Sequence, residues 1–385
     1  MSPLQKPNSP FFSSGPCKKH PGWQLSHLKD ALLSRAHRSE ICKAQLKLLI
    51  DSFHEILELP QDYKVAILPG SDTAAFECAL WSFLSPLGVE VLAWEKFGLD
   101  WVEDIQNHLK IEPCVAHVAA YGEMPDLTKV NFDRDVVFCW NGTTSGVKVK
   151  DATWIPDDRK GLTICDATSA LFSMAVDWKK LDVTTFSWQK ALGGEAQHGM
   201  IVLSPRAVKR LETFVPNRSL PKIFRLTNNG KLIEGLFRGE TINTPSMLCV
   251  EDALQALEWV KKSGGIDQMI QRSEMNFRRL SSWVEVSPYF DFMAVDKAHR
   301  SNTSVCLKII DPELSFMSLK ESRDFILTME ALLTKKEVAY DIRTHAASPT
   351  GLRIWCGCMV ESKDIDLLLP WLEWAYLETK RDVLK

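Results

Sequence analysis

One lysine and one aspartate stand where they could together carry cofactor chemistry. Lys190 lies in the run from Phe186 to Gly194, after an apolar stretch and before small residues and two glycines. Asp166 stands 24 positions earlier and ends an apolar run that begins at Thr163. Such a lysine is suited to a Schiff base with pyridoxal phosphate (PLP), and such an aspartate can keep the pyridine nitrogen of PLP protonated. Taken singly, each has an ordinary explanation as a loop lysine or a strand-end residue.

Two polar turns could bind the anionic and hydroxyl groups of such a cofactor. The run from Pro69 to Thr73 joins an apolar strand to a helical pattern, and the free N–H groups at a helix start bind anions. The run from Trp140 to Gly146 carries hydroxyls at a strand end, where ligands of open α/β sheets bind. Each turn alone is better explained as a cap or a polar loop. Asp72 counts against a side-chain contact with a phosphate, because the two anions repel each other.

Three basic residues could bind anionic substrate groups. Arg353 lies inside the otherwise apolar run from Leu352 to Trp355, and a buried arginine needs an anionic partner. A substrate carboxylate and a structural salt bridge are equally open at this point. His37 and Arg38 follow a helix-like stretch and could be either an anion-binding pair or a surface basic patch.

Composition limits the class of protein. The chain has 385 residues, of which 45% are hydrophobic and 25% charged, as expected for a soluble globular protein with more than one domain. A net charge of −3 gives no reason to expect nucleic acid, and no apolar run is long enough to cross a membrane. The residues up to Pro16 lack an apolar signal core, and the ten cysteines lie mostly in apolar context, so we expect a cytoplasmic protein. Cys356 and Cys358 lack a second pair at zinc spacing, so we expect no metal site.

Strands and helices alternate in the first half of the chain, which predicts an α/β fold with a mostly parallel, helix-covered sheet. The runs that predict strands span residues 64–68, 89–93, 135–140, 162–165, 183–187 and 199–203, with a helix at about 73–84. After about residue 250 longer helical patterns predominate, at 250–261, 266–283, 318–335 and 362–379, with strands at 305–310 and 352–356. We therefore predict a large domain of residues 1–250, including the N-terminal segment, and a smaller α+β domain of residues 251–385.

These segments, in this order, resemble the phosphoserine aminotransferases, a family of fold-type I PLP enzymes. The motifs that carry the resemblance are Ser14-Gly15-Pro16, His37-Arg38-Ser39, Gly142 to Val147, Asp166 to Ser169, Trp188-Gln189-Lys190 and Asn243-Thr244-Pro245. The resemblance runs from Phe12 to the strand around Arg353. It implies a seven-stranded, mainly parallel sheet in the large domain. It also implies PLP-dependent transfer of an amino group between L-glutamate and 3-phosphohydroxypyruvate in serine biosynthesis, and in some organisms a related step of pyridoxine synthesis.

The resemblance implies a role for each matching residue of the cofactor site. Lys190 would hold the cofactor and move a proton between the substrate Cα and the cofactor C4′. Asp166 would pair with the pyridine nitrogen. Asp72, Thr73 and Gln189 would contribute to the site of the cofactor phosphate, Asp72 through its backbone.

Further cofactor contacts would come from both subunits of a homodimer with shared active sites. Thr143 would reach the phenolic oxygen or the ring. Phe97 fits best as the aromatic that stacks on the ring, with Trp101 as the rival. Asn243 and Thr244 would reach the cofactor phosphate from the neighbouring subunit.

The substrate would be held by basic residues. The resemblance implies that His37 and Arg38 bind the substrate phosphate and that Arg353 binds the α-carboxylate. Arg343 and His345 are candidates for a second pair of phosphate-binding residues.

Other functions remain open on the sequence. An aminotransferase of the alanine–glyoxylate type would gain nothing from a substrate phosphate, and a non-catalytic protein that kept the fold would not need PLP. A cysteine desulfurase would need a cysteine on a mobile loop, whereas Cys306, Cys356 and Cys358 lie in strand-like runs.

Overall fold

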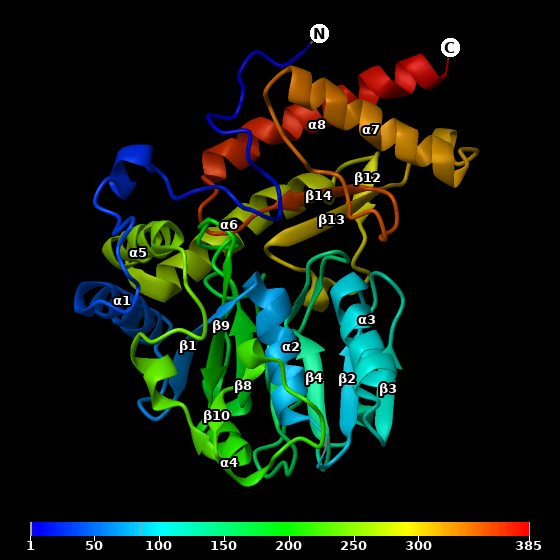
Figure 1. Ribbon diagram of the computed structural model, residues 1–385. Coiled ribbons are helices and arrows are strands. Elements are labelled where there is room, and N and C mark those ends of the chain that lie inside the picture. Colours follow the sequence, from blue (N-terminus) through cyan, green and yellow to red (C-terminus); the bar gives the residue numbers. More distant parts are fainter. Residues whose placement is uncertain (1, 85, 385) are drawn as a thin grey trace.

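A seven-stranded sheet forms the centre of the larger part of the molecule (Figure 1). The computed structural model describes residues 2–84 and 86–384. In spatial order the strands are β1 (Lys64–Pro69), β9 (His198–Leu203), β8 (Val183–Phe186), β7 (Thr163–Asp166), β4 (Asp135–Cys139), β2 (Val89–Ala93) and β3 (Cys114–Val118). Strand β9 is antiparallel to its neighbours β1 and β8, and the other pairs are parallel. The prediction of an α/β fold with a mainly parallel sheet is confirmed.

Both faces of this sheet are covered by helices, because its strands are apolar on both sides. In β1, for example, Val65 and Ile67 belong to one hydrophobic cluster while Ala66 and Leu68 belong to the other. Helix α2 (Ser71–Phe83) packs in the second cluster, and helices α1 (Glu40–Ile56) and α5 (Met247–Lys262) pack in the first. The remaining elements of this part are α3 (Lys96–Glu103), α4 (Pro205–Thr213) and the short strands β5 (Asn141–Gly142), β6 (Val147–Lys148), β10 (Thr227–Asn228) and β11 (Lys231–Leu232).

Strand β3 and helix α1 are among the elements of the large part that were not predicted. Strand β3 lies at the edge of the sheet and is only partly buried, so its run has no strong apolar pattern. Helix α1 buries one face, on which Leu46, Leu49 and Phe53 recur at helical spacing. His37 and Arg38 directly precede this helix and its N-cap Ser39, and the helix-like stretch expected before them forms a short 3-10 helix, Leu25–Leu28, followed by turns.

A second, antiparallel sheet forms the centre of the C-terminal part. Its strands are β12 (Phe290–Phe292), β13 (Ser304–Ile309) and β14 (Leu352–Trp355), and its helices are α6 (Gly265–Val284), α7 (Leu319–Lys335) and α8 (Ser362–Val383). One hydrophobic cluster continues from the first sheet into this part.

The N-terminal segment crosses the C-terminal part, and both chain ends lie there (Figure 1). The indole of Trp371 donates to the carbonyl of Gln5 at 2.7 Å, and the amide of Trp355 donates to the carbonyl of Phe12 at 2.9 Å. The segment that was expected with the large domain is thus hydrogen-bonded to the other part. The division near residue 250 stays a prediction.

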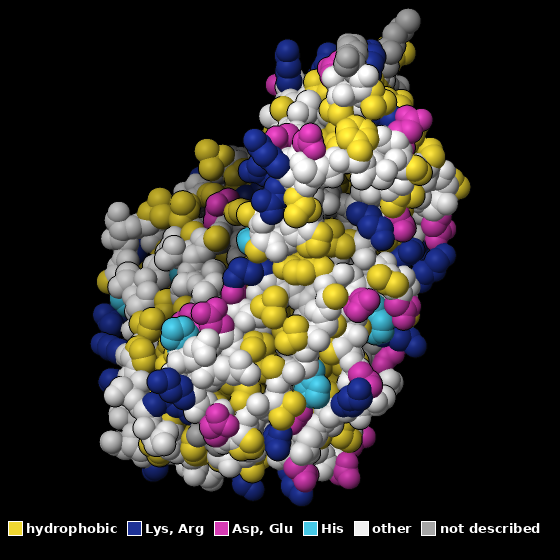
Figure 2. Space-filling model, turned by 90° about the vertical axis from the view of Figure 1, so that its right-hand side faces the viewer, with side chains coloured by type: hydrophobic (Ala, Val, Ile, Leu, Met, Phe, Trp, Pro, Cys, Tyr) yellow, Lys and Arg dark blue, Asp and Glu magenta, His cyan; other side chains and the backbone are white. Residues whose placement is uncertain are grey.

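Charges of both signs are interspersed on the face of the molecule that Figure 2 shows. None of the helices in the described residues is both long and apolar enough to span a lipid bilayer.

Candidate active site

The carboxyl ends of several strands meet at one edge of the large sheet, next to the start of α2. Cys139 at the end of β4 is the register partner of Asp166 at the end of β7, and Lys190 follows the next strand, β8, in a turn. A cavity of about 170 Å³ lies at this edge. The predicted cofactor residues that line it are Asp72, Thr73, Phe97, Thr143, Asp166, Gln189 and Lys190.

The amine of Lys190 lies inside the protein against the N-terminal segment. Its Nζ donates to the backbone carbonyl of Ser14 at 2.7 Å. A Cβ atom at Gly15 would lie 2.4 Å from this nitrogen, so only glycine allows the segment to pass so close. Burial lowers the pKa of the Lys190 amine below its usual value.

Asp166 has a second carboxyl group as its neighbour. Its Oδ1 accepts from the backbone N–H of Thr168 at 3.0 Å. Asp72, in the first turn of α2, is 7% exposed. Burial, together with the negative charge of Asp166, raises the pKa of Asp72 well above its usual value. Of these two neighbouring carboxyl groups, Asp72 is therefore the one whose negative form is disfavoured.

Hydrogen bonds hold the hydroxyl of Thr143 in place at the cavity wall. Thr143 lies in the loop between β5 and β6, and its Oγ1 donates to Ser169 Oγ at 2.7 Å. Asn141 Nδ2 donates to the same oxygen at 2.8 Å and to Thr303 Oγ1 at 3.1 Å. Because Thr303 belongs to the C-terminal part, this network ties the two parts together at the cavity.

Phe97 and Trp101 both line the cavity from α3. Phe97 is 37% exposed, and its ring centroid lies 6.3 Å from that of His345. Trp101 is 5% exposed and packs on Phe76 with 4.6 Å between ring centroids. The choice of Phe97 as the stacking aromatic stays a prediction, which its greater accessibility favours.

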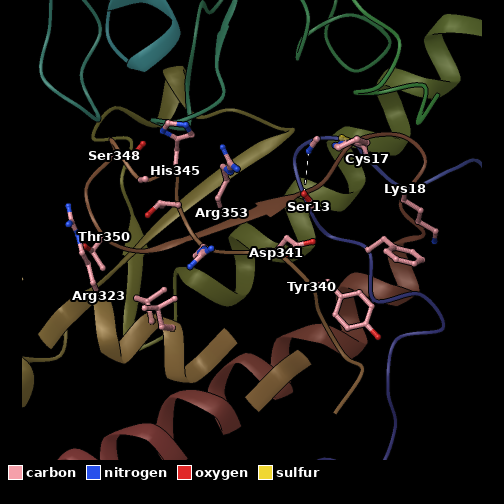
Figure 3. A pocket seen from close by; sticks show the side chains of 18 of the residues that line it. Ser13, Cys17, Lys18, Arg323, Tyr340, Asp341, His345, Ser348, Thr350 and Arg353 are labelled. Carbon is pink, nitrogen blue, oxygen red and sulfur yellow. Dashed lines mark hydrogen bonds between the residues drawn. The ribbon is translucent and has the colours of Figure 1, made fainter. Parts of the chain in front are cut away.

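A wider cavity of about 820 Å³ adjoins the first one and contains several basic residues (Figure 3). Gly15, which contacts Lys190, lines this cavity together with the predicted Arg353, Arg343 and His345. Its other walls come from α7, which contributes Arg323, and from the N-terminal segment. The amine of Lys190 therefore lies where the two cavities adjoin.

The wider cavity has two arginines without an acidic partner. Its lysines are paired, Lys18 with Asp364 at 3.1 Å and Lys19 with Asp252 at 2.6 Å, and Arg343 Nε lies 3.6 Å from Glu330. In contrast, Arg323 and Arg353 form no ion pair with any described residue.

Arg353 is the more deeply placed of these two arginines. Its side chain extends from β14, and its Nε is buried without a hydrogen-bond partner among the described residues. Burial lowers the pKa of its guanidinium group. The structural salt bridge that the sequence left open for Arg353 is not found in the described part of the chain, and its role as the partner of a substrate carboxylate stays a prediction.

Four predicted residues line neither cavity of this chain. They are His37, Arg38, Asn243 and Thr244. Arg38, Asn243 and Thr244 are exposed, and His37 Nε2 is buried without a partner among the described residues. A single chain thus does not bring them to Lys190, and their predicted roles require a second subunit.

Comparison with known proteins identifies the family. Residues 128–368, which include Asp166, Lys190 and Arg353, match the family described as aminotransferase class-V. A phosphoserine aminotransferase of Methanosarcina barkeri is 52% identical over 98% of this chain and 99% of its own length. The chain belongs to the phosphoserine aminotransferase family. It is accordingly a PLP-dependent transaminase, as predicted.

Solved structures of phosphoserine aminotransferases have the same fold. The one from Cytophaga hutchinsonii superposes with a TM-score of 0.80 at 21% identity and covers 95% of this chain and 99% of its own. A PLP-bound one from Trichomonas vaginalis superposes with a TM-score of 0.74 at 15% identity and covers 95% and 100%. At these identities the likeness concerns the fold alone.

The smaller cavity fits PLP by its unsatisfied polar atoms. The buried atoms on its wall that lack a partner among the described residues are Asp72 Oδ1, Trp101 Nε1, Asn141 Oδ1, Thr168 Oγ1 and Gln189 Oε1. Each such atom costs about 1–3 kcal/mol unless a ligand or water satisfies it. The phosphate and the phenolic oxygen of PLP are acceptors, so they would satisfy the donors Trp101 Nε1 and Thr168 Oγ1, and the start of α2 adds N–H groups for the phosphate.

Sequence reasoning missed three features of the phosphoserine aminotransferase site. Glu95 lines the smaller cavity, and Arg323 lines the wider one. Ser14 and Gly15 were part of a matching motif but received no role. Glu95 could have been noticed as an acidic residue directly after an apolar run that predicts a strand, because ligands of α/β sheets bind beyond strand ends. Nothing in the sequence around Arg323 distinguishes it from other helix-surface arginines.

Proposed function

We propose that this protein transfers an amino group between L-glutamate and 3-phosphohydroxypyruvate, giving O-phospho-L-serine and 2-oxoglutarate. The full-length relationship at 52% identity supports this substrate pair. The observation that carries the proposal is the pair of unpaired guanidinium groups, Arg353 and Arg323, on the wall of one cavity beside Lys190. Both substrates carry two anionic ends, and arginine binds carboxylate and phosphate in the same planar geometry.

The reaction depends on a proton moved by Lys190. Because burial lowers the pKa of this amine, a larger share of it is unprotonated at neutral pH and able to take the proton from the substrate Cα. When bound, PLP supplies an electron-poor ring that accepts the electrons left at Cα. Asp166 would pair with the pyridine nitrogen and keep it protonated. Arg353 would orient the substrate by its α-carboxylate so that the Cα–H bond faces Lys190.

The proposed working unit is a homodimer with shared active sites. The exposed Asn243 and Thr244 precede α5, and the amide of Ser246 in the same loop donates to His198 Nε2 at 3.2 Å. Contact of this surface with a second copy would place Asn243 and Thr244 at the neighbouring cofactor, and it accounts for their absence from the cavities of one chain. We also propose a cytoplasmic location, which the ten free cysteines support.

The choice of substrate can be tested with a panel of keto acids. With glutamate as donor, we expect kcat/KM for 3-phosphohydroxypyruvate to exceed that for pyruvate or glyoxylate by about 100-fold or more, because the site loses a charged hydrogen-bonding partner when the phosphate is absent. A coupled assay of 2-oxoglutarate formation measures it. Comparable values for all three acids would favour the alanine–glyoxylate type instead, and no turnover with any donor would favour a binding protein.

A matched pair of variants on α7 sharpens this test. Arg323→Gln should raise KM for the phosphorylated acid by about tenfold, because it removes one charge-assisted contact. Lys320→Gln lies on the same helix outside the cavity and should leave KM unchanged. Equal effects of the two variants would show that Arg323 acts only through general charge.

Shared active sites predict that two impaired variants can restore each other. Arg38→Ala should raise KM for the phosphorylated substrate far more than for an unphosphorylated one, because the proposed contact of Arg38 is with the phosphate. Lys190→Ala should be inactive. When the two proteins are unfolded together and refolded, hybrid dimers would combine Lys190 of one chain with Arg38 of the other. Recovered activity at low substrate concentration is the expected result, and a mixture no better than its components would contradict the shared site.

A further inference from the structure

We propose that Glu95 is a positioning residue. It would hold two proposed contacts of the cofactor, Phe97 and Thr143, at a fixed distance and orientation to each other. Glu95 lies between β2 and α3 and is 1% exposed. It lines the same cavity as Phe97 and Thr143. The proposal rests on the cofactor contacts that are proposed above for these two residues.

The carboxylate of Glu95 first fixes the start of α3. It is the N-cap of this helix, and its Oε1 accepts from the backbone N–H of Gly98 at 2.9 Å. Phe97 lies in the same first turn, so the bond sets where this ring stands at the cavity.

The other oxygen of Glu95 fixes the loop that carries Thr143. Glu95 Oε2 accepts from the hydroxyl of Thr144 at 2.7 Å and from its backbone N–H at 3.2 Å. The Thr144 hydroxyl in turn accepts from the backbone N–H of Lys96 at 3.1 Å. Three hydrogen bonds thus join two segments that are 49 positions apart in the chain.

Close packing also surrounds this junction, so a change in the hydrogen bonds of Glu95 is felt directly by the neighbouring loop. The indole of Trp94 donates to the carbonyl of Val147 at 2.9 Å. A Cβ atom at Gly142 would lie 2.7 Å from Trp94 Nε1 and 2.8 Å from Glu95 Cγ, so the loop passes this point only because residue 142 is glycine. We conclude that Glu95 is the central acceptor of a rigid junction.

The ionised form of Glu95 suits this geometry, since all three of its neighbours are donors. Burial raises the pKa of its carboxyl group to about 7, and the bonds from Thr144 and Gly98 counteract this rise. Glu95→Gln is therefore an informative change. The amide has nearly the same shape, but its nitrogen cannot accept a hydrogen bond, so one side of the junction opens.

A buried carboxylate in β2, the strand that precedes Glu95, provides the control. Glu90, in β2, is 2% exposed and binds Arg134 at 2.7 Å and His117 at 2.6 Å. It lines neither cavity. Glu90→Gln should lower thermal stability without changing how PLP is bound.

The effect should appear before any turnover. In the cofactor-free protein, we expect amide hydrogen exchange of residues 142–146 to become faster in Glu95→Gln but not in Glu90→Gln. Titration with PLP, followed by quenching of tryptophan fluorescence, should give a dissociation constant raised by about tenfold in Glu95→Gln alone. The visible circular dichroism of the bound cofactor should change as well, because the groups around it shift.

Further variants test the positioning role of Glu95 separately from the proposed cofactor contacts of Phe97 and Thr143. Thr144→Val should reproduce the effect, and combined with Glu95→Gln it should add little, because both changes open one junction. If Glu95→Gln does not fold, Thr144→Val alone carries the test. Unchanged PLP affinity, dichroism and exchange in these variants would overturn the positioning role. Phe97→Leu and Thr143→Val test the contacts themselves: if neither alters PLP binding, the proposed cofactor contacts fail, whatever Glu95 does.

Discussion

Replacing Lys190 by alanine should abolish transamination. We expect kcat to fall by on the order of 10⁴-fold or more, because the residue that binds the cofactor covalently and moves the proton is lost. The visible absorbance band of the lysine-bound cofactor should disappear at the same time. Steady-state assays with glutamate and 3-phosphohydroxypyruvate, together with the absorption spectrum of the purified protein, measure both effects.

Lys190→Arg separates the chemistry of the amine from its charge. Arginine keeps a cation near the Ser14 carbonyl but stays protonated at neutral pH, so it can neither attach the cofactor nor accept a proton. We expect it to be as inactive as the alanine variant. Substantial turnover by either variant would refute the assignment of Lys190.

The two neighbouring carboxyl groups should respond very differently to the same substitution. Asp166→Asn removes the charge that we expect opposite the pyridine nitrogen, so kcat should fall by on the order of 10³-fold while PLP still binds. Asp72→Asn replaces a group that we expect to be neutral already, since burial and Asp166 raise its pKa. It should change kcat by less than about tenfold. Single-turnover rates and PLP titrations of both variants measure this asymmetry.

The pH dependence provides a second readout of this pair. Since the pKa of Asp72 is raised, its proton leaves only at a pH above the usual range for a carboxyl group, and a second negative charge then develops beside Asp166. Asp72→Asn removes this ionisation and should leave activity less sensitive to rising pH. A severe loss in Asp72→Asn with a mild one in Asp166→Asn would mean that the two roles are reversed.

Much of the fold could be predicted from local pattern. The apolar runs at residues 64–68, 135–140 and 199–203 correspond to β1, β4 and β9, because a buried strand must be apolar on both faces wherever it lies in the sheet. Strand β3 was not predicted, because it is an edge strand and has no such run. The N-terminal segment was assigned to the large part, whereas it is hydrogen-bonded to both parts, through Trp371 and Trp355 on one side and Lys190 on the other.

Site residues that directly follow strands could be predicted from the sequence. Site residues whose positions depend on tertiary packing could not. Lys190, Asp166 and Thr143 stand at the carboxyl ends of parallel strands, and such ends meet at one edge of a sheet by construction. Glu95 and Arg323 were missed because their importance depends on neighbours that are far away in the chain. Glu95 bonds to Thr144, and Arg323 reaches the wider cavity from a helix of the other part.

By itself, the sequence determined the class of fold, the family and the residues able to hold and activate PLP, because strand patterns and strand-end residues are local properties of the chain. Only the tertiary structure decided which groups adjoin them. Lys190 meets a carbonyl 176 positions away, Asp72 comes to lie beside Asp166, and two arginines are left without acidic partners among the described residues. Such contacts arise when whole helices and strands pack together. They join residues that are far apart in the chain, so a local sequence pattern cannot predict them.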